Sequence, residues 1–95
     1  MLYAILFTDR PGHDDVRQRL MPVHLQFLEE NRAHIRAAGP LRDAQDGVGA
    51  GGLWLVEAQS PAVVARLVEA DPFWPTGLRD SVRILEWHRV FEVPG

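Results

Sequence analysis

The chain has 95 residues, a net charge of −3 and 46% hydrophobic residues, and it contains no cysteine. This length suits one domain over residues 1–95 with a small core, and the hydrophobic content excludes a disordered chain. The acidic balance argues against a nucleic-acid partner, and the lack of cysteine excludes disulfides, thiolate metal sites and cysteine nucleophiles.

Residues 2–8 predict the first strand. They form a β-rich apolar run, and the turn sequence Asp9-Arg10-Pro11-Gly12 ends it. After this turn, Asp14 and Asp15 can cap a short helical turn over residues 16–20. The chain is therefore expected to open with one strand, a turn and a short helical segment.

Pro22 predicts the start of the first long helix, because proline suits a first helical position and breaks or kinks a helix that is already running. From Pro22 onward, apolar residues recur at helical spacing, which predicts a helix over residues 22–37. Gly39-Pro40 is expected to stop it. Residues 41–45 are a weak strand candidate, and the glycine-rich stretch 47–52 follows them.

The second half of the chain predicts a strand, a helix and a strand. Residues 53–58 form a clear apolar strand, and Ser60-Pro61 then supplies an N-cap and a first helical position. Asp71-Pro72 ends this second helix. Residues 73–80 are expected to form a loop, and residues 82–93 a long final strand. The predicted fold class is α+β, with the ferredoxin-like order βαββαβ.

The strands have apolar residues on both faces. In the first strand, Leu2, Ala4 and Leu6 alternate with Tyr3, Ile5 and Phe7. A βαββαβ domain places both helices on one face of its sheet, so the other face would normally be polar. A large exposed apolar face indicates a partner, and the simplest partner is a second copy related by a two-fold axis. We expect a homodimer; the alternative is that these residues lie at strand ends or in a thin core.

His24 and Asp71 are the candidate catalytic residues. With Pro22 as the first helical residue, His24 would be the third, where the positive end of the helix dipole disfavours imidazolium. A nearby Asp71 carboxylate would orient the ring and stabilise the imidazolium as it forms, so the two would act as a general acid–base. The alternatives are a structural histidine on a helix face, and an Asp-Pro pair that only ends a helix.

The order of the motifs resembles the YCII-related (YciI-like) domain family. The motifs are a Pro-Gly turn after the first strand, Pro-x-His-Leu, Gly-Pro-Leu, a glycine before an apolar strand, and Asp-Pro-Phe. The resemblance covers nearly the whole chain and implies a dimeric α+β barrel in which paired sheets face each other. It also implies an active-site pocket with a histidine and an aspartate, which here are His24 and Asp71. A related member is similar to lyases that eliminate chloride from an aromatic ring, and the fold resembles muconolactone isomerases and cofactor-free monooxygenases.

Four further residues are candidates for binding a substrate. Arg10 could hold an anionic group, although a solvated turn arginine explains it as well. Gly52 could let the backbone approach a ligand, although turn geometry explains it equally. Pro40 lies in the Gly-Pro-Leu motif, and Phe73 could wall a pocket or belong to the core. The four histidines show no metal-ligand spacing, so we expect no metal.

These observations favour a small enzyme that needs no cofactor and uses the His24–Asp71 pair for acid–base chemistry on a small organic molecule. No serine or cysteine stands at a recognisable nucleophile position, so isomerase or lyase chemistry fits better than a hydrolase triad. The alternatives are a non-catalytic ligand-binding or interaction domain, and a cofactor-free monooxygenase-like protein. With no signal-peptide pattern and no apolar run of membrane-spanning length, we expect a cytoplasmic protein without a membrane partner.

Overall fold

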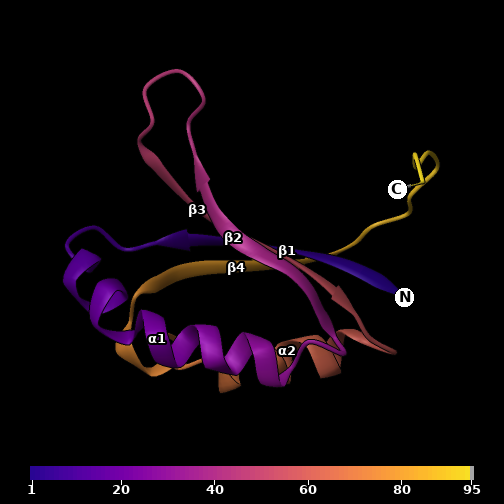
Figure 1. The fold of residues 1–95 in the computed structure, drawn as a ribbon, viewed down its shortest axis with the longest axis horizontal. Helices are drawn as coiled ribbons and strands as arrows, with labels where there is room; N and C mark the ends of the chain where they lie inside the picture. Colours follow the sequence, from indigo (N-terminus) through magenta and orange to yellow (C-terminus); the bar gives the residue numbers. More distant parts are fainter. Residues whose placement is uncertain (95) are drawn as a thin grey trace.

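The fold is α+β: a four-stranded antiparallel sheet with two helices on one of its faces (Figure 1). The computed structural model describes residues 1–94. The elements along the chain are β1 (Leu2–Asp9), α1 (Asp14–Glu30), β2 (Ile35–Arg42), β3 (Gly49–Glu57), α2 (Pro61–Ala70), the short 3-10 helix η1 (Trp74–Thr76) and β4 (Arg79–Glu86). Within the described chain, no helix has both the length and the apolar character needed to cross a membrane.

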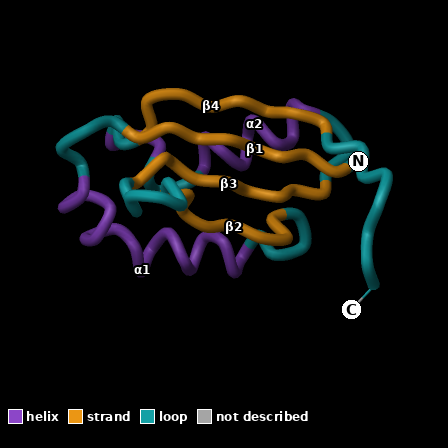
Figure 2. Tube along the Cα trace, turned by 90° about the horizontal axis from the view of Figure 1, so that it is seen from above, coloured by secondary structure: helices purple, strands orange, loops and turns teal. Residues whose placement is uncertain are grey.

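The strand order is β2-β3-β1-β4, and each neighbouring pair is antiparallel. Seen from above, α1 runs along the β2 side of the sheet and α2 passes beneath β1 and β4 (Figure 2). This order, with one helix after β1 and one after β3, is the ferredoxin-like βαββαβ arrangement, so the predicted fold class is confirmed.

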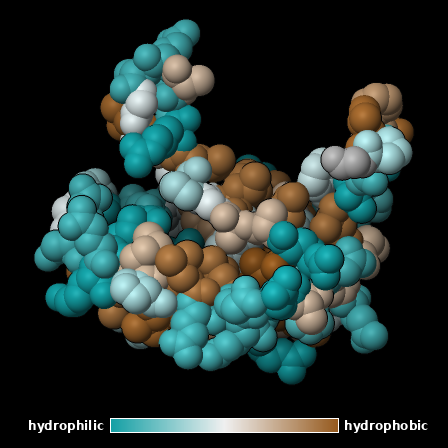
Figure 3. Space-filling view, viewed as in Figure 1, coloured by the Kyte–Doolittle hydropathy of each residue, from teal (hydrophilic) through white to brown (hydrophobic). Residues whose placement is uncertain are grey.

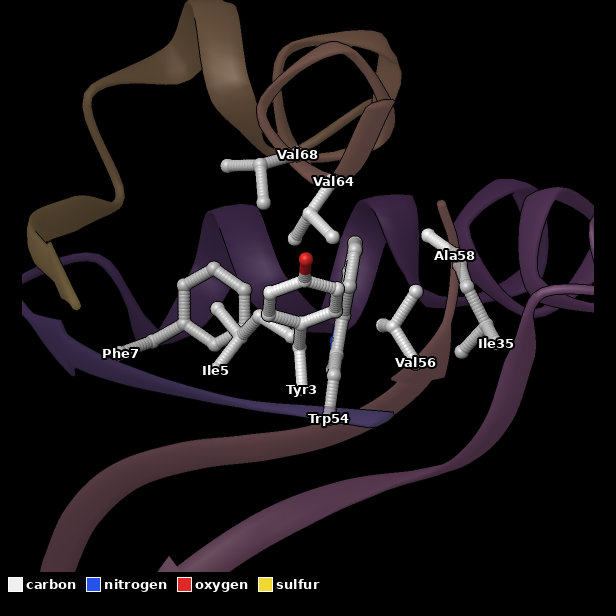
Figure 4. Close-up of a cluster of buried hydrophobic side chains, with 9 residues drawn as sticks. All are labelled: Tyr3, Ile5, Phe7, Ile35, Trp54, Val56, Ala58, Val64 and Val68. Atoms are coloured by element: carbon white, nitrogen blue, oxygen red, sulfur yellow. The ribbon is translucent and has the colours of Figure 1, made fainter. Parts of the chain in front are cut away.

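The core lies between the sheet and the helices (Figure 4). Alternate residues of β1 point toward the helices because side chains on a strand alternate between its two faces. The core residues of β1, β3 and α2 include Tyr3, Ile5, Phe7, Trp54, Val56, Val64 and Val68. Ser60 caps α2 by accepting a hydrogen bond from the Val63 amide at 3.4 Å, which is the N-cap that the Ser60-Pro61 sequence predicts.

Helix α1 begins at Asp14, and Pro22 lies in its interior, so the prediction of a new helix at Pro22 was wrong. Proline removes one backbone hydrogen bond, to the carbonyl of Gln18 four residues earlier. Pro22 and Gln18 are both exposed, so water can bond to that carbonyl. The helical turns on either side of Pro22 therefore join into one helix of 17 residues.

Helix α1 also ends earlier than predicted, at Glu30, because Asn31 caps it. The Asn31 side chain donates a hydrogen bond to the Phe27 carbonyl at 2.8 Å. Ile35, which matched the helical spacing, is a buried residue of β2, so the helix over 22–37 and the strand over 41–45 were both misplaced. Gly39-Pro40 lies inside β2, which tolerates proline because it is an edge strand.

Strand β4 ends at Glu86, so the predicted strand over 82–93 was too long. The Trp87 amide still donates to the Leu2 carbonyl at 2.9 Å, and the chain then leaves the sheet as an irregular tail (Figure 1). The apolar side chains of Val90, Phe91 and Val93 are exposed along this tail. Their apolar character extended the predicted strand, but beyond Trp87 the tail is irregular.

The open face of the sheet is apolar, as the strand pattern predicts. Six half-buried residues share it: Leu2, Ala4, Leu6, Leu53, Leu55 and Leu85. Apolar side chains gather over the sheet between the projecting β2–β3 hairpin and the C-terminal tail (Figure 3). This surface is the basis for the homodimer, which stays a prediction.

Gly51 of β3 is a position where no side chain fits. Its φ is +98°, and a Cβ placed there would lie 1.8 Å from the carbonyl oxygen of Phe7. We expect Gly51→Ala to lower the free energy of unfolding by more than about 3 kcal/mol, since it combines backbone strain with a backbone clash. Urea unfolding measures this, with Gly49→Ala as the control because a Cβ at Gly49 meets open space. Equal stability of the two variants would contradict the prediction.

Candidate active site

His24 lies in the interior of α1, between two and three turns from its first residue. Within α1, all of which the structure describes, it is the only buried residue, and 7% of its surface is exposed. Because α1 begins at Asp14 rather than Pro22, His24 is not at the positive end of the helix. The expectation that the helix dipole would act on it was therefore wrong.

Asp71 lies at the C-terminal end of α2, where Pro72 prevents the helix from continuing. Its backbone is extended, and its side chain turns back toward its own loop, where Oδ1 accepts a hydrogen bond from the Phe73 amide at 3.0 Å. Only 1% of the residue is exposed. The Asp-Pro-Phe sequence thus fixes a buried carboxylate at the end of a helix.

The two residues meet. His24 Nδ1 lies 2.9 Å from Asp71 Oδ1, and the other carboxylate oxygen accepts a hydrogen bond from Arg79 Nη2 at 2.6 Å. The imidazole also stacks on the Phe73 ring, with centroids 4.2 Å apart and planes at 18°. The chain thus holds the His24 ring in one orientation from two sides. Contact between His24 and Asp71 was expected, while their catalytic role stays a prediction.

Asp71 is ionised in this environment. Burial raises its pKa, but the hydrogen bonds from His24 and the Phe73 amide, together with the charge of Arg79, outweigh burial and lower the pKa below its usual value. An ionised carboxylate can only accept hydrogen bonds, so Nδ1 of His24 must carry the hydrogen. In neutral His24 the second nitrogen, Nε2, then has a free lone pair.

Arg79, the first residue of β4, completes the buried cluster. Its side chain is 4% exposed, and its guanidinium lies 3.7 Å from the centroid of the Phe7 ring. Burial lowers its pKa, and the Asp71 carboxylate opposes that effect; an arginine nevertheless stays charged in proteins. Arg79 therefore adds its positive charge to the hydrogen bonds from His24 and the Phe73 amide, which together lower the pKa of the buried Asp71.

A pocket of about 110 Å³ lies beside His24. Its lining residues are Arg17, Met21, His24, Leu25, Leu28, Ala38, Gly39, Pro40, Gly52, Trp54 and Arg79. Asp71 is not among them, so the carboxylate stands behind the imidazole. A larger and more open hollow of about 550 Å³ lies at the C-terminal end of α1, but none of its lining residues is a buried ionisable group. The smaller pocket is therefore the candidate active site.

The structure brings some of the predicted substrate-binding residues to this pocket. Pro40 and Gly52 line it, and Phe73 stacks on His24 from behind. Arg10 lies elsewhere: it is exposed and pairs with Asp80 at 3.6 Å. The structure therefore gives no support to Arg10 as a ligand for the same substrate.

Sequence reasoning missed Arg17 and Arg79. Arg17 is seven residues before His24, a spacing that puts both on one face of a helix, so a helix beginning at Asp14 would have indicated it. No sequence spacing indicates Arg79, because it belongs to the edge strand β4 and comes to the site only through the tertiary structure.

Acid should destabilise the protein through Asp71. A carboxyl group with a lowered pKa in the folded state contributes stability above its unfolded value of 3.8, and this contribution is lost as the pH falls through the folded pKa. We expect the free energy of unfolding to fall as the pH is lowered from about 5 to about 2. Urea unfolding at several pH values measures this, and Asp71→Asn should show a weaker pH dependence. An equal dependence in both proteins would contradict the prediction.

Comparison with known proteins identifies the family of the chain. The YCII-related domain model matches residues 1–88, and the chain belongs to that family. Among solved structures, it is similar to 5-chloro-2-hydroxyhydroquinone dehydrochlorinase from Burkholderia phenoliruptrix in complex with 2,5-dihydroxybenzoquinone. The two are 35% identical, with a TM-score of 0.81, over 93% of this chain and 94% of the other.

A protein from Agrobacterium tumefaciens also matches, with 19% identity and a TM-score of 0.34, over 95% of this chain and 96% of the other. None of the functionally curated proteins compared with the chain matches it. The dehydrochlorinase shows that this fold includes a lyase-type enzyme that acts on a small molecule.

Proposed function

We propose that the protein is a small-molecule enzyme of the lyase or isomerase type, with His24 as its acid–base group. The observation that supports this most is the buried His24–Asp71 pair, 2.9 Å apart, with His24 lining the pocket and Asp71 behind it. The similarity to a dehydrochlorinase agrees with it, since elimination of a leaving group needs a base.

In the proposed reaction, Nε2 of His24 takes a proton from the substrate. The resulting imidazolium donates from Nδ1 to Asp71, whose negative charge stabilises it. Arg79 and the Phe73 amide hold the carboxylate in place throughout. The electron pair left on the substrate then expels a leaving group, as in a lyase, or is reprotonated at another atom, as in an isomerase. His24 returns the proton in the second case and releases it to solvent in the first.

A turnover assay tests this function. The purified protein is incubated with small hydroxylated rings, some bearing chlorine and some not, while chloride release is followed by ion chromatography and rearrangement by NMR. We expect turnover of at least one compound, with loss of turnover in His24→Gln. Binding without turnover across the panel would instead favour a non-catalytic ligand-binding domain.

We also propose that the apolar open face of the sheet pairs with the same face of a second copy. Burying six apolar residues from each chain would remove a surface that monomers rarely expose. Sedimentation at micromolar concentration should give twice the chain mass of 10.7 kDa. Leu55→Glu, in the middle of this face, should yield monomers, whereas Ala62→Glu on the exposed side of α2 should not. A monomeric unmodified protein would contradict the proposal.

A further inference from the structure

The polar side chains that line the active-site pocket are all hydrogen-bond donors or bases. They are the guanidinium groups of Arg17 and Arg79 and the imidazole of His24; among the described residues that line the pocket, none is acidic. The other lining side chains are apolar, and Trp54 is the largest of them. Such a lining suits a ligand that is mostly apolar and carries negative charge on oxygen.

Arg79 uses only part of its donor capacity inside the protein. Nη2 donates to Asp71, while Nε is buried and has no partner among residues 1–94. The third nitrogen, Nη1, is neither bonded to a described residue nor sealed from solvent, and the side chain lines the pocket. A buried guanidinium with unused donors beside a cavity is a preorganised site for an anion, because its charge is already desolvated.

Arg17 reaches the same pocket from α1. One of its nitrogens, Nη2, forms an ion pair with Asp9, and its guanidinium lies 5.3 Å from the centroid of the Phe73 ring. Asp9 does not line the pocket, although its charge acts on Arg79 as well as on Arg17. Only Nη2 of Arg17 bonds to Asp9, so its other two nitrogens are available to a group in the pocket.

We infer that the pocket binds a small ring compound in its ionised form, with a phenolate or enolate oxygen held by Arg79 and Arg17 beside Nε2 of His24. This inference rests on the proposed function and adds the charge state of the substrate. The volume of about 110 Å³ is smaller than the roughly 150 Å³ of a cavity that holds one benzene ring, so only a small compound fits, with part of its ring at the mouth of the pocket. Two guanidinium donors would also stabilise the additional negative charge that is delocalised onto this oxygen when His24 removes a proton from another atom of the substrate.

The experiment measures the ionisation of a bound probe and needs no turnover. The probe is 4-nitrophenol, whose neutral and ionised forms absorb at different wavelengths, and the neutral control is 4-nitroanisole, in which a methyl group replaces the ionisable hydrogen. At a pH where half of the free probe is ionised, we expect the bound probe to favour the ionised form by about tenfold or more. The anisole should bind at least about tenfold more weakly than the ionised phenol.

Variants identify the groups responsible. Arg79→Gln and Arg17→Gln should return the bound probe toward the ionised fraction of the free probe, while the exposed Arg66→Gln should not. His24→Gln should keep most of the shift, because the arginines rather than proton transfer to His24 cause it. If Arg79→Gln fails to fold, the double variant Asp71→Asn/Arg79→Gln, which removes both charges together, replaces it.

A probe that fails to bind, binds in its neutral form, or keeps its ionised fraction in both arginine variants would overturn the inference. Each of these results would leave the acid–base role of His24 untouched, since that role is measured by turnover. Conversely, loss of turnover in His24→Gln with a neutral bound probe would support the proposed function and refute the oxyanion site.

Discussion

His24→Gln should lower the rate of the catalysed reaction by roughly a hundredfold to ten-thousandfold while the protein stays folded. Glutamine can fill much of the space and donate to Asp71, but it cannot take up a proton. Glutamine is a better test than alanine, because His24 is buried and stacked on Phe73, so truncation would also leave a cavity. Turnover and circular dichroism together measure the two effects, with the exposed His34→Gln as the control.

Asp71→Asn should also lower the rate of the catalysed reaction. The amide group of asparagine can turn its hydrogens toward Nδ1, which favours the tautomer with hydrogen on Nε2 and removes the base. If both His24→Gln and Asp71→Asn retained full turnover on a substrate of the wild-type protein, His24 would be a structural histidine.

Arg79→Met should destabilise the protein by about 3–5 kcal/mol, because it leaves the Asp71 carboxylate buried without its positive partner. Of the two side chains, Arg79 is 4% and Asp71 0% exposed, so solvent does little to screen the loss. Urea unfolding measures the change, and Arg83→Met, on the same strand but exposed, is the control.

The double variant Asp71→Asn/Arg79→Met separates two costs of the Arg79→Met change. One is the buried, unpaired charge left on Asp71, and the other is the lost packing of the Arg79 side chain. Removing both charges should recover part of the stability that Arg79→Met loses, since no unpaired buried charge remains. If Arg79→Met stayed within about 0.5 kcal/mol of the wild-type protein, the ion pair would have no structural role.

The sequence predicted the fold class and the contact between His24 and Asp71, for identifiable physical reasons. Short, β-rich apolar runs predicted β1 and β3, and Ser60-Pro61 marked the start of α2 through capping chemistry. The contact between His24 and Asp71 followed from the order of short motifs, not from spacing, since the two residues are 47 positions apart.

The remaining differences come from tertiary context that local patterns do not contain. Pro22 normally marks a helix start, yet it lies inside α1 where its lost hydrogen bond faces water. Gly39-Pro40 normally ends an element, yet edge strand β2 accommodates it. Arg79 carries no local mark of function, because it becomes part of the site only when β4 pairs with β1 beside the end of α2.

Nitrogen-15 NMR of the His24 ring tests the central claim most directly, because it needs no knowledge of the substrate. The claim is that ionised Asp71 fixes the hydrogen on Nδ1 and leaves Nε2 as a base facing the pocket. In the neutral ring we expect Nδ1 to show the chemical shift of a protonated nitrogen and Nε2 that of an unprotonated one, with Asp71→Asn weakening or reversing this preference. A neutral ring with its hydrogen on Nε2 in the wild-type protein would contradict the claim.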